Sequence, residues 1–213
     1  MALLPISISA QELTKNDSTS PSISLLQHLQ KNEIVDIVLT TDFDKLRAEK
    51  SKRAYQPANF SVYHDKEEEV SMDMQVRVRG KFRARSCKTP PMKIKFKKKI
   101  LRANGFNKFN ELKLVIPCAD DLEFEQYIAK EFLIYKLFNL LSANSFQVQL
   151  VNLKFRQEGK KKAGLERLAF IIEDREELLA RTGFDAFPDS LRLLPKDFDP
   201  SAEGLHHWHL LSP

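Results

Sequence analysis

The stretch MQVRVRGKFRARSCKTPPMKIKFKKK, residues 74–99, decides how this chain folds. At both of its ends, apolar and cationic residues alternate with a period of two, which predicts two half-buried strands with one face in the core. The loop between them contains a Pro pair and is not expected to be helical. The inward set is Val76, Val78, Met92, Ile94 and Phe96, and the outward set is Arg77, Arg79, Lys93, Lys95 and Lys97.

Positive charge is concentrated in this part of the chain. Thirteen Lys or Arg and no Asp or Glu lie between Arg77 and Lys108. The whole chain is only +5, so the rest of it carries a net charge of −8. This local segregation predicts an anionic ligand, with phosphate as the first candidate. If the two strands are neighbours, the predicted phosphate-binding residues are Arg77, Arg79, Lys93 and Lys95 on one face and Arg83 and Arg85 at its rim.

Two other interpretations of the basic segment remain open. It could be a solvated face that is paired with acids of the long helix, Asp120, Asp121, Glu123, Glu125 and Glu131. Nucleic acid is a less favoured partner, because Phe82, Phe96, Phe106 and Phe109 interleave the charges as stacking surfaces do, yet no known nucleic-acid-binding module is present.

Length and composition predict one folded domain. The 213 residues are 42% hydrophobic and include fifteen Phe, enough for a core without a structural metal. No apolar run approaches the roughly 18 residues of a membrane span. We expect a signal-peptide remnant and flexible lead-in over residues 1–32, an α+β domain over 33–183, and an irregular tail over 184–213.

The N-terminus, MALLPISISA, is similar to the apolar half of a secretory signal, followed by a small residue at which a peptidase could cut. We therefore expect export to the periplasm or the extracellular space. A disordered N-terminus on a cytoplasmic protein is the alternative. Cys87 and Cys118 each follow a predicted strand and are candidates for a disulfide, which an exported protein would form and a cytosolic one would not.

The remaining pattern predicts a mostly antiparallel sheet with one long packed helix, which is also the plan of a kinase N-terminal lobe. The long helix covers residues 119–143, and an apolar stripe on much of its circumference predicts a core role. The predicted strands are 34–43, 58–64, 70–80, 92–98, 111–117, 146–156 and 166–173, and the short helices are 44–50 and 174–182.

No catalytic signature is found in the sequence. There is no GxSxG, P-loop, HExxH or dinucleotide motif. The cluster of His206, His207 and His209 has no further ligand at metal spacing, so no metal site is predicted there.

The order of motifs resembles the CotH-like (spore coat protein H) family of atypical kinases, in its divergent exported bacterial branch. The resemblance covers about residues 33–183 and rests on RVRG at 77–80, KIKF at 93–96 and FIIED at 170–174. It implies binding of ATP and Mg²⁺ between two lobes. It also implies phosphate contacts from Arg77, Arg79 and Lys93 or Lys95.

The resemblance implies two further roles. Glu125 or Glu131 on the long helix would orient a lysine, as the helix-C glutamate of kinases does. Glu173, at the exit from the last strand, would lie near the nucleotide base.

The chain departs from the family in two places. Lys81 and Phe82 stand where the family tends to have Asn and Ser. The family's catalytic aspartate and metal ligands belong to a second lobe, and Asp197 and Asp199 match its metal motif poorly. The expectation is therefore a truncated or frameshifted N-terminal lobe without phosphoryl transfer. An exported, non-enzymatic anion- or partner-binding protein is the alternative.

Overall fold

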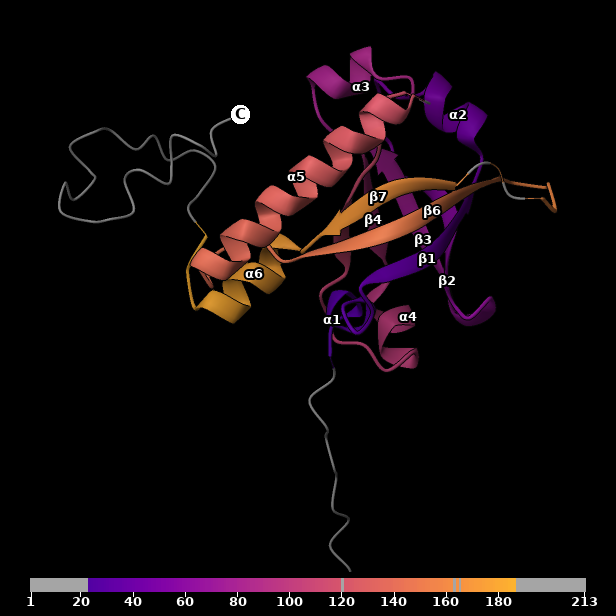
Figure 1. The fold of residues 1–213 in the computed structure, drawn as a ribbon. Coiled ribbons are helices and arrows are strands. Elements are labelled where there is room, and N and C mark those ends of the chain that lie inside the picture. The colour runs from indigo at the N-terminus through magenta and orange to yellow at the C-terminus, as the bar shows by residue number, and fades with distance from the viewer. Residues whose placement is uncertain (1–22, 120, 163, 165, 187–213) are drawn as a thin grey trace, which may run out of the picture.

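The computed structural model describes residues 23–119, 121–162, 164 and 166–186. Figure 1 shows a β-barrel with short helices at its two ends and one long helix lying diagonally across its outer surface. The predicted roles of residues 1–22 and of the tail from 187 onward, including His206, His207 and His209, lie outside the described residues.

Seven strands of the described chain form one closed barrel in the order β1-β2-β3-β4-β5-β7-β6. All neighbouring strands are antiparallel except β1 and β6, which run parallel with Ile34 opposite Leu150. The strands are β1 Ile34–Thr41, β2 Gln56–His64, β3 Glu67–Val78, β4 Met92–Phe96, β5 Glu111–Val115, β6 Val148–Gln157 and β7 Glu166–Ile172.

The parallel pair follows from the number of strands. Strand directions that alternate up and down cannot close a ring of seven, so at least one neighbouring pair must be parallel. The predicted sheet was therefore correct in being mostly antiparallel and wrong in being an open layer. Closure leaves the barrel with no unpaired sheet edge.

The barrel core is built from the inward residues of the alternating strands. β4 shows the pattern most clearly, because Met92, Ile94 and Phe96 are buried and the lysines between them are not. Two short helices, α1 (Leu25–Leu29) and α4 (Lys98–Ala103), cover one end of the barrel in Figure 1, and their apolar side chains join the same core.

The other helices lie at the opposite end or on the outer surface. α2 (Phe43–Ala48) and α3 (Phe82–Ser86) stand at the opposite end of the barrel. α5 (Leu122–Leu141) packs on the outer face of β7 and β6, and α6 (Arg175–Thr182) lies beside its C-terminal end. None of the described helices has the length and apolar character of a membrane-spanning helix, in agreement with the sequence-based expectation.

Three short helices differ from expectation. α3 lies in the basic loop that was predicted to be non-helical, and the prolines that prompted that prediction follow the helix instead of interrupting it. α4 lies in a segment for which no helix was predicted. α1 lies within the predicted flexible lead-in, at SLLQHLQ (24–30), the one part of it whose sequence offers a short helical turn. A capping box at Ser24 starts the helix, and burial of Leu25, Leu26 and Leu29 makes it part of the fold.

The predicted disulfide is present: Cys87 and Cys118 are bonded. The bond ties the end of α3 to the segment between β5 and α5, where the backbone N–H of Thr89 also donates to the Cys118 carbonyl. The loop between β3 and β4 is therefore fastened to the base of the long helix.

The predicted core role of α5 is only partly right. Ile128 is buried against β5, β6 and β7, with Phe132 and Tyr135 half-buried beside it. On the other side, Leu133, Leu137 and Leu140 are exposed, because no described element covers that side of the helix.

Candidate anion-binding site

The outer face of β3, β4 and β5 carries a row of cations across neighbouring strands. Arg77 lies opposite Lys93, and Lys93 lies opposite Lys113. The alternation places these side chains outward while Val76, Ile94 and Leu112 point into the barrel. We call Arg77, Arg79, Lys93, Lys95 and Lys113 the basic face.

Arg79 lies just beyond the end of β3 and is half-buried. Its backbone N–H donates to the carbonyl of Pro91, which holds it beside β4. Burial lowers the pKa of the Arg79 guanidinium, and the nearby charge of Arg83 lowers it further, while Tyr135 and Glu131 of α5 oppose the shift. Arg79 therefore stands between the barrel and the long helix.

Lys113 is the cation that sequence reasoning missed. Burial lowers its pKa to about 8, and the charges of Arg79 and then Lys93 contribute to the shift. Its Nζ lies 4.2 Å from the centroid of the Phe146 ring. In the ELKLV pattern, Lys113 looks like any other outward-facing lysine of a strand. The strand register could have identified it, because Lys113 lies opposite Lys93 and so extends the Arg77–Lys93 row by one strand.

A single acid at the other end of the face forms ion pairs with two of the lysines. Glu111 on β5 pairs with Lys93 and, at 3.2 Å, with Lys95. Burial raises the pKa of Glu111, but hydrogen bonds from both lysines outweigh it and hold the pKa below its usual value. The hydrogen bond to Glu111 likewise raises the pKa of Lys95.

The acids of the long helix take different partners from those expected. Glu131 is 3.8 Å from Arg83, and Glu125 is 4.0 Å from Arg167. The orienting of a lysine by either acid stays a prediction; the ion pairs found at both positions are with arginines. The solvated-face interpretation is partly confirmed, because Glu131 of the long helix pairs with Arg83 of the basic segment. It did not foresee Glu111, the strand residue that pairs with Lys93 and Lys95.

The described residues supply no carboxylate within ion-pair distance of Arg77, Arg79 or Lys113. Arg77 instead lies over the ring of Tyr55, with its Cζ 5.1 Å from the ring centroid, and the Lys95 Nζ lies 5.8 Å from the same ring. The basic face therefore has an upper part beside α5 without ion-paired carboxylates and a lower part in which Lys93 and Lys95 share the single carboxylate of Glu111.

Arg83 and Arg85, the predicted rim residues, differ in their surroundings. The Arg83 guanidinium donates to the Ile116 carbonyl at 3.2 Å, in addition to its contact with Glu131. Arg85 is exposed at the end of α3, and its carbonyl accepts a hydrogen bond from Lys50. Arg83 is thus fixed beside Arg79, whereas Arg85 faces solvent.

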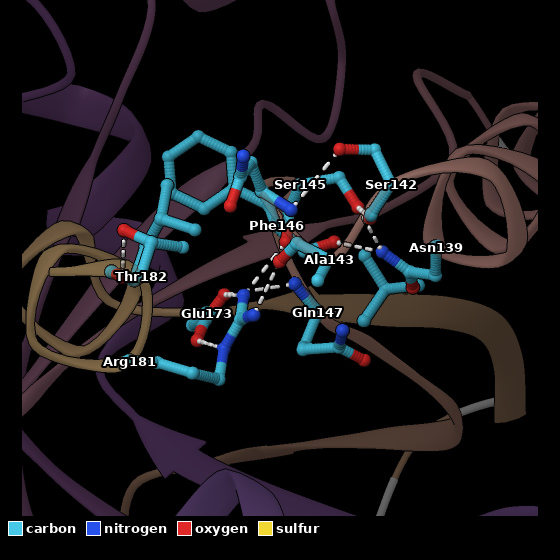
Figure 2. A network of polar contacts seen from close by, with 12 residues as sticks. Asn139, Ser142, Ala143, Ser145, Phe146, Gln147, Glu173, Arg181 and Thr182 are labelled. Carbon is cyan, nitrogen blue, oxygen red and sulfur yellow. Dashed lines mark hydrogen bonds and ion pairs between the residues drawn. The ribbon is translucent and has the colours of Figure 1, made fainter. Parts of the chain in front are cut away.

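Glu173, which the resemblance placed near a nucleotide base, is 1% exposed and fully engaged. Figure 2 shows its carboxylate held by the guanidinium of Arg181, with both contacts at 3.0 Å, and by the backbone N–H of Gln147 at 2.9 Å. Arg181 also donates to the carbonyls of Ala143 and Ser145. The network fastens α6 to the end of β7 and to the turn after α5.

A cavity lies on the inner side of the same strands. It has a volume of about 630 Å³, with Val78, Met92 and Ile116 in its wall and Arg47 and Lys160 at its rim. It opens at the end of the barrel that carries α2, and none of the basic-face residues lines it. The basic face is therefore a surface of its own.

The fit of Mg²⁺ is tested by the carboxylates present. Within the described residues, no group of three or more His, Cys, Asp or Glu side chains is arranged to hold a metal ion. The basic face offers cations to the phosphates of a nucleotide but no ligand set for its metal. Comparison with protein-family models, curated proteins and solved structures finds no match for this chain.

Proposed function

We propose that the protein binds a phosphate-bearing anion on the upper part of the basic face, between β3, β5 and α5. One observation supports this most directly: Arg79 and Lys113 are both half-buried cations, and no carboxylate of the described chain forms an ion pair with either. Glu131 and Asp174 act on them only through longer-range charge, which does not outweigh the cost of burial. Desolvated charges of one sign are unfavourable, and an anion would supply the missing counter-charge.

Phosphate suits the residues better than a carboxylate does. The guanidinium groups of Arg77 and Arg79 offer forked donors, and Lys93 and Lys113 add point charges. A chain of two or three phosphates would match several cations spread over three strands. The CotH-like motif order supports a nucleoside triphosphate as the ligand.

The proposal is binding without phosphoryl transfer. Transfer requires positioned metal ions and a residue that orients the acceptor, and the described residues include no cluster of three or more His, Cys, Asp or Glu side chains placed to hold a metal ion. ATP with Mg²⁺ thus remains an implication of the resemblance, and the proposed ligand is the phosphate chain itself.

Nucleic acid is less well supported. Of the four Phe side chains that interleave the charges, Phe96 and Phe106 are buried in the barrel core. Only Phe82 is strongly exposed, on α3. A stacking platform needs several exposed rings along one surface, so a non-enzymatic anion-binding protein is the better alternative.

The test is calorimetric titration of the full chain with tripolyphosphate, ATP and heparin, each at about 0.15 M salt to screen weak surface attraction. Lys113→Gln and Arg79→Gln should each weaken tripolyphosphate binding by roughly tenfold or more, the size of one charge-assisted hydrogen bond. Lys97→Gln is the matched control, because it removes one exposed charge from the same segment.

The outcomes separate three interpretations. Equal losses from Lys97→Gln and Lys113→Gln would overturn a defined site and leave only general basicity. Binding of ATP no tighter than tripolyphosphate would reject the nucleotide while keeping the anion site. Heparin binding that survives both site substitutions would favour a diffuse partner-binding surface.

A further inference from the structure

The solvent side of α5 exposes several large apolar side chains. Large apolar side chains recur along it, and Leu140 and Leu133 are 85% and 63% exposed. A helix that is apolar on both sides is normally buried on both sides. We call this surface the outer α5 face; its residues are Tyr127, Leu133, Ile134, Leu137, Leu140 and Leu141.

The contacts of α5 leave this face unmatched. Ile128, Phe132 and Tyr135 pack onto the barrel, so the helix already has its inner partner. Single exposed leucines are ordinary, but a contiguous row of them marks a surface that another segment covers. The position of the covering segment can be inferred from where the chain leaves α6.

The end of α6 is fixed next to the C-terminal end of α5. The Arg181 guanidinium donates to the carbonyls of Ala143 and Ser145, which directly follow α5 (Figure 2). Gly183 ends α6 in the left-handed conformation, and the next residue, Phe184, is 56% exposed. The described chain therefore leaves α6 near the C-terminal end of α5, which carries Leu140 and Leu141.

The sequence of residues 187–213 suits the outer α5 face. It is rich in large apolar side chains, as is the face that it would cover. Ten extended residues reach roughly 33 Å, as far as the about 30 Å length of a twenty-residue helix. Its large apolar residues are Phe187, Leu191, Leu193, Leu194, Phe198, Leu205, Trp208, Leu210 and Leu211.

We propose that residues 187–213 pack against the outer α5 face and act as its intramolecular cover. The attachment through α6 gives the segment a high effective concentration at this face, so weak apolar contacts suffice. A second copy of the chain is the competing occupant, and it differs in depending on protein concentration.

Trp208 makes the test possible in the full chain, because it is the single tryptophan of the protein. If the segment is docked, its fluorescence should be blue-shifted relative to the urea-unfolded chain and shielded from acrylamide. The double substitution Leu137→Glu with Leu140→Glu should shift the emission to the red and raise quenching toward the unfolded value. Both residues are exposed, so the fold should persist, which far-UV circular dichroism checks.

The matched control is Phe82→Glu, which replaces an equally exposed apolar side chain on α3, beside the other end of α5 in Figure 1. It should leave the emission unchanged. Leu140→Gln, a milder single variant, covers the case in which the double variant loses its fold.

Three results would overturn the proposal. Emission of the native chain equal to that of the unfolded chain would show an undocked segment. A blue-shifted emission that the α5 substitutions leave unchanged would mean that Trp208 is buried at a site other than the outer α5 face. A shift that disappears on dilution, together with a change in sedimentation, would assign the face to a second copy.

Discussion

Arg79 lowers the pKa of Lys113, although Arg79 follows β3 and Lys113 lies on β5, two strands away in the barrel. The two cations are brought together because both stand on the outer face, next to α5. Their mutual repulsion is a cost that the fold retains, which is the reason for assigning a ligand to this position.

Replacing Lys113 should change how stability depends on pH. The folded-state pKa of about 8 is below the ordinary lysine value of 10.5, so between these values the unfolded chain binds more protons. The contribution of Lys113 to stability therefore rises from pH 8 to 10.5. Lys113→Met should be more stable than the wild type at pH 7.5, and the difference should shrink by pH 10 in urea unfolding. A stability difference between variant and wild type that is the same at pH 7.5 and pH 10 would contradict the lowered pKa of Lys113.

The same titration predicts the pH dependence of ligand binding. An anion that contacts the Lys113 ammonium needs it protonated, so tripolyphosphate affinity should fall as the pH rises through 8 in the free protein. The measurement is titration calorimetry across this range. Lys113→Gln serves as the control, and its weaker binding should lack this fall.

Glu177 on α6 provides a second pH-dependent contribution, of opposite sign. Burial raises the pKa of its carboxyl to about 7, while a hydrogen bond with Ser24 opposes the shift. The folded chain therefore binds more protons than the unfolded chain between pH 4.5, the ordinary pKa of a glutamate, and pH 7. Stability from this group is present below pH 4.5 and falls as the pH rises to 7.

Glu177→Gln should accordingly be more stable than the wild type at pH 8, by no more than about 3 kcal/mol, and indistinguishable near pH 4.5. Urea unfolding at the two pH values measures the difference. A variant that is less stable at pH 8 would show that the charged carboxylate has a stabilising partner.

Loss of Arg181 should destabilise the protein strongly. Arg181→Ala leaves the buried carboxylate of Glu173 without its cation, which costs about 3–5 kcal/mol when one partner of a buried pair is removed. The double variant Arg181→Ala with Glu173→Gln should recover part of the loss, since no charge is left buried. Equal destabilisation by the single and double variants would mean that the carbonyl contacts of Arg181 matter more than the ion pair.

The disulfide should contribute roughly 3–4 kcal/mol, because it closes a loop of about thirty residues in the unfolded chain. Cys87→Ser with Cys118→Ser should lower the free energy of unfolding by that amount. Wild-type protein unfolded in reductant should match the variant, and the variant should be insensitive to reductant. Unequal values would point to structural strain in the variant.

The sequence predicted local structure better than it predicted assembly. The alternation in β3 and β4 specified which residues face the core, and burial of Met92, Ile94 and Phe96 confirms it. Closure of the barrel depends on the β1–β6 pairing, and no periodic pattern encodes which distant strand will lie beside another. The same limit hid Lys113 and Glu111, whose importance comes from their cross-strand neighbours.

The long helix shows the complementary limit. An apolar stripe on most of its circumference predicted burial, but hydrophobicity alone does not say which segment does the burying. The barrel covers the side that carries Ile128, and the side that carries Leu137 is left open by the described chain.

The parallel pairing of β1 with β6 also has a consequence for synthesis on the ribosome. Residues 34–41 emerge early, but their partner at 148–157 is translated only after more than a hundred further residues. Until then one edge of β1 has no neighbour, and contacts of such long sequence separation are slow to form. During synthesis, the strands from β1 to β5 therefore form an incomplete sheet until β6 is available. The edge of β1 stays unpaired in that time and is a surface that a chaperone can protect.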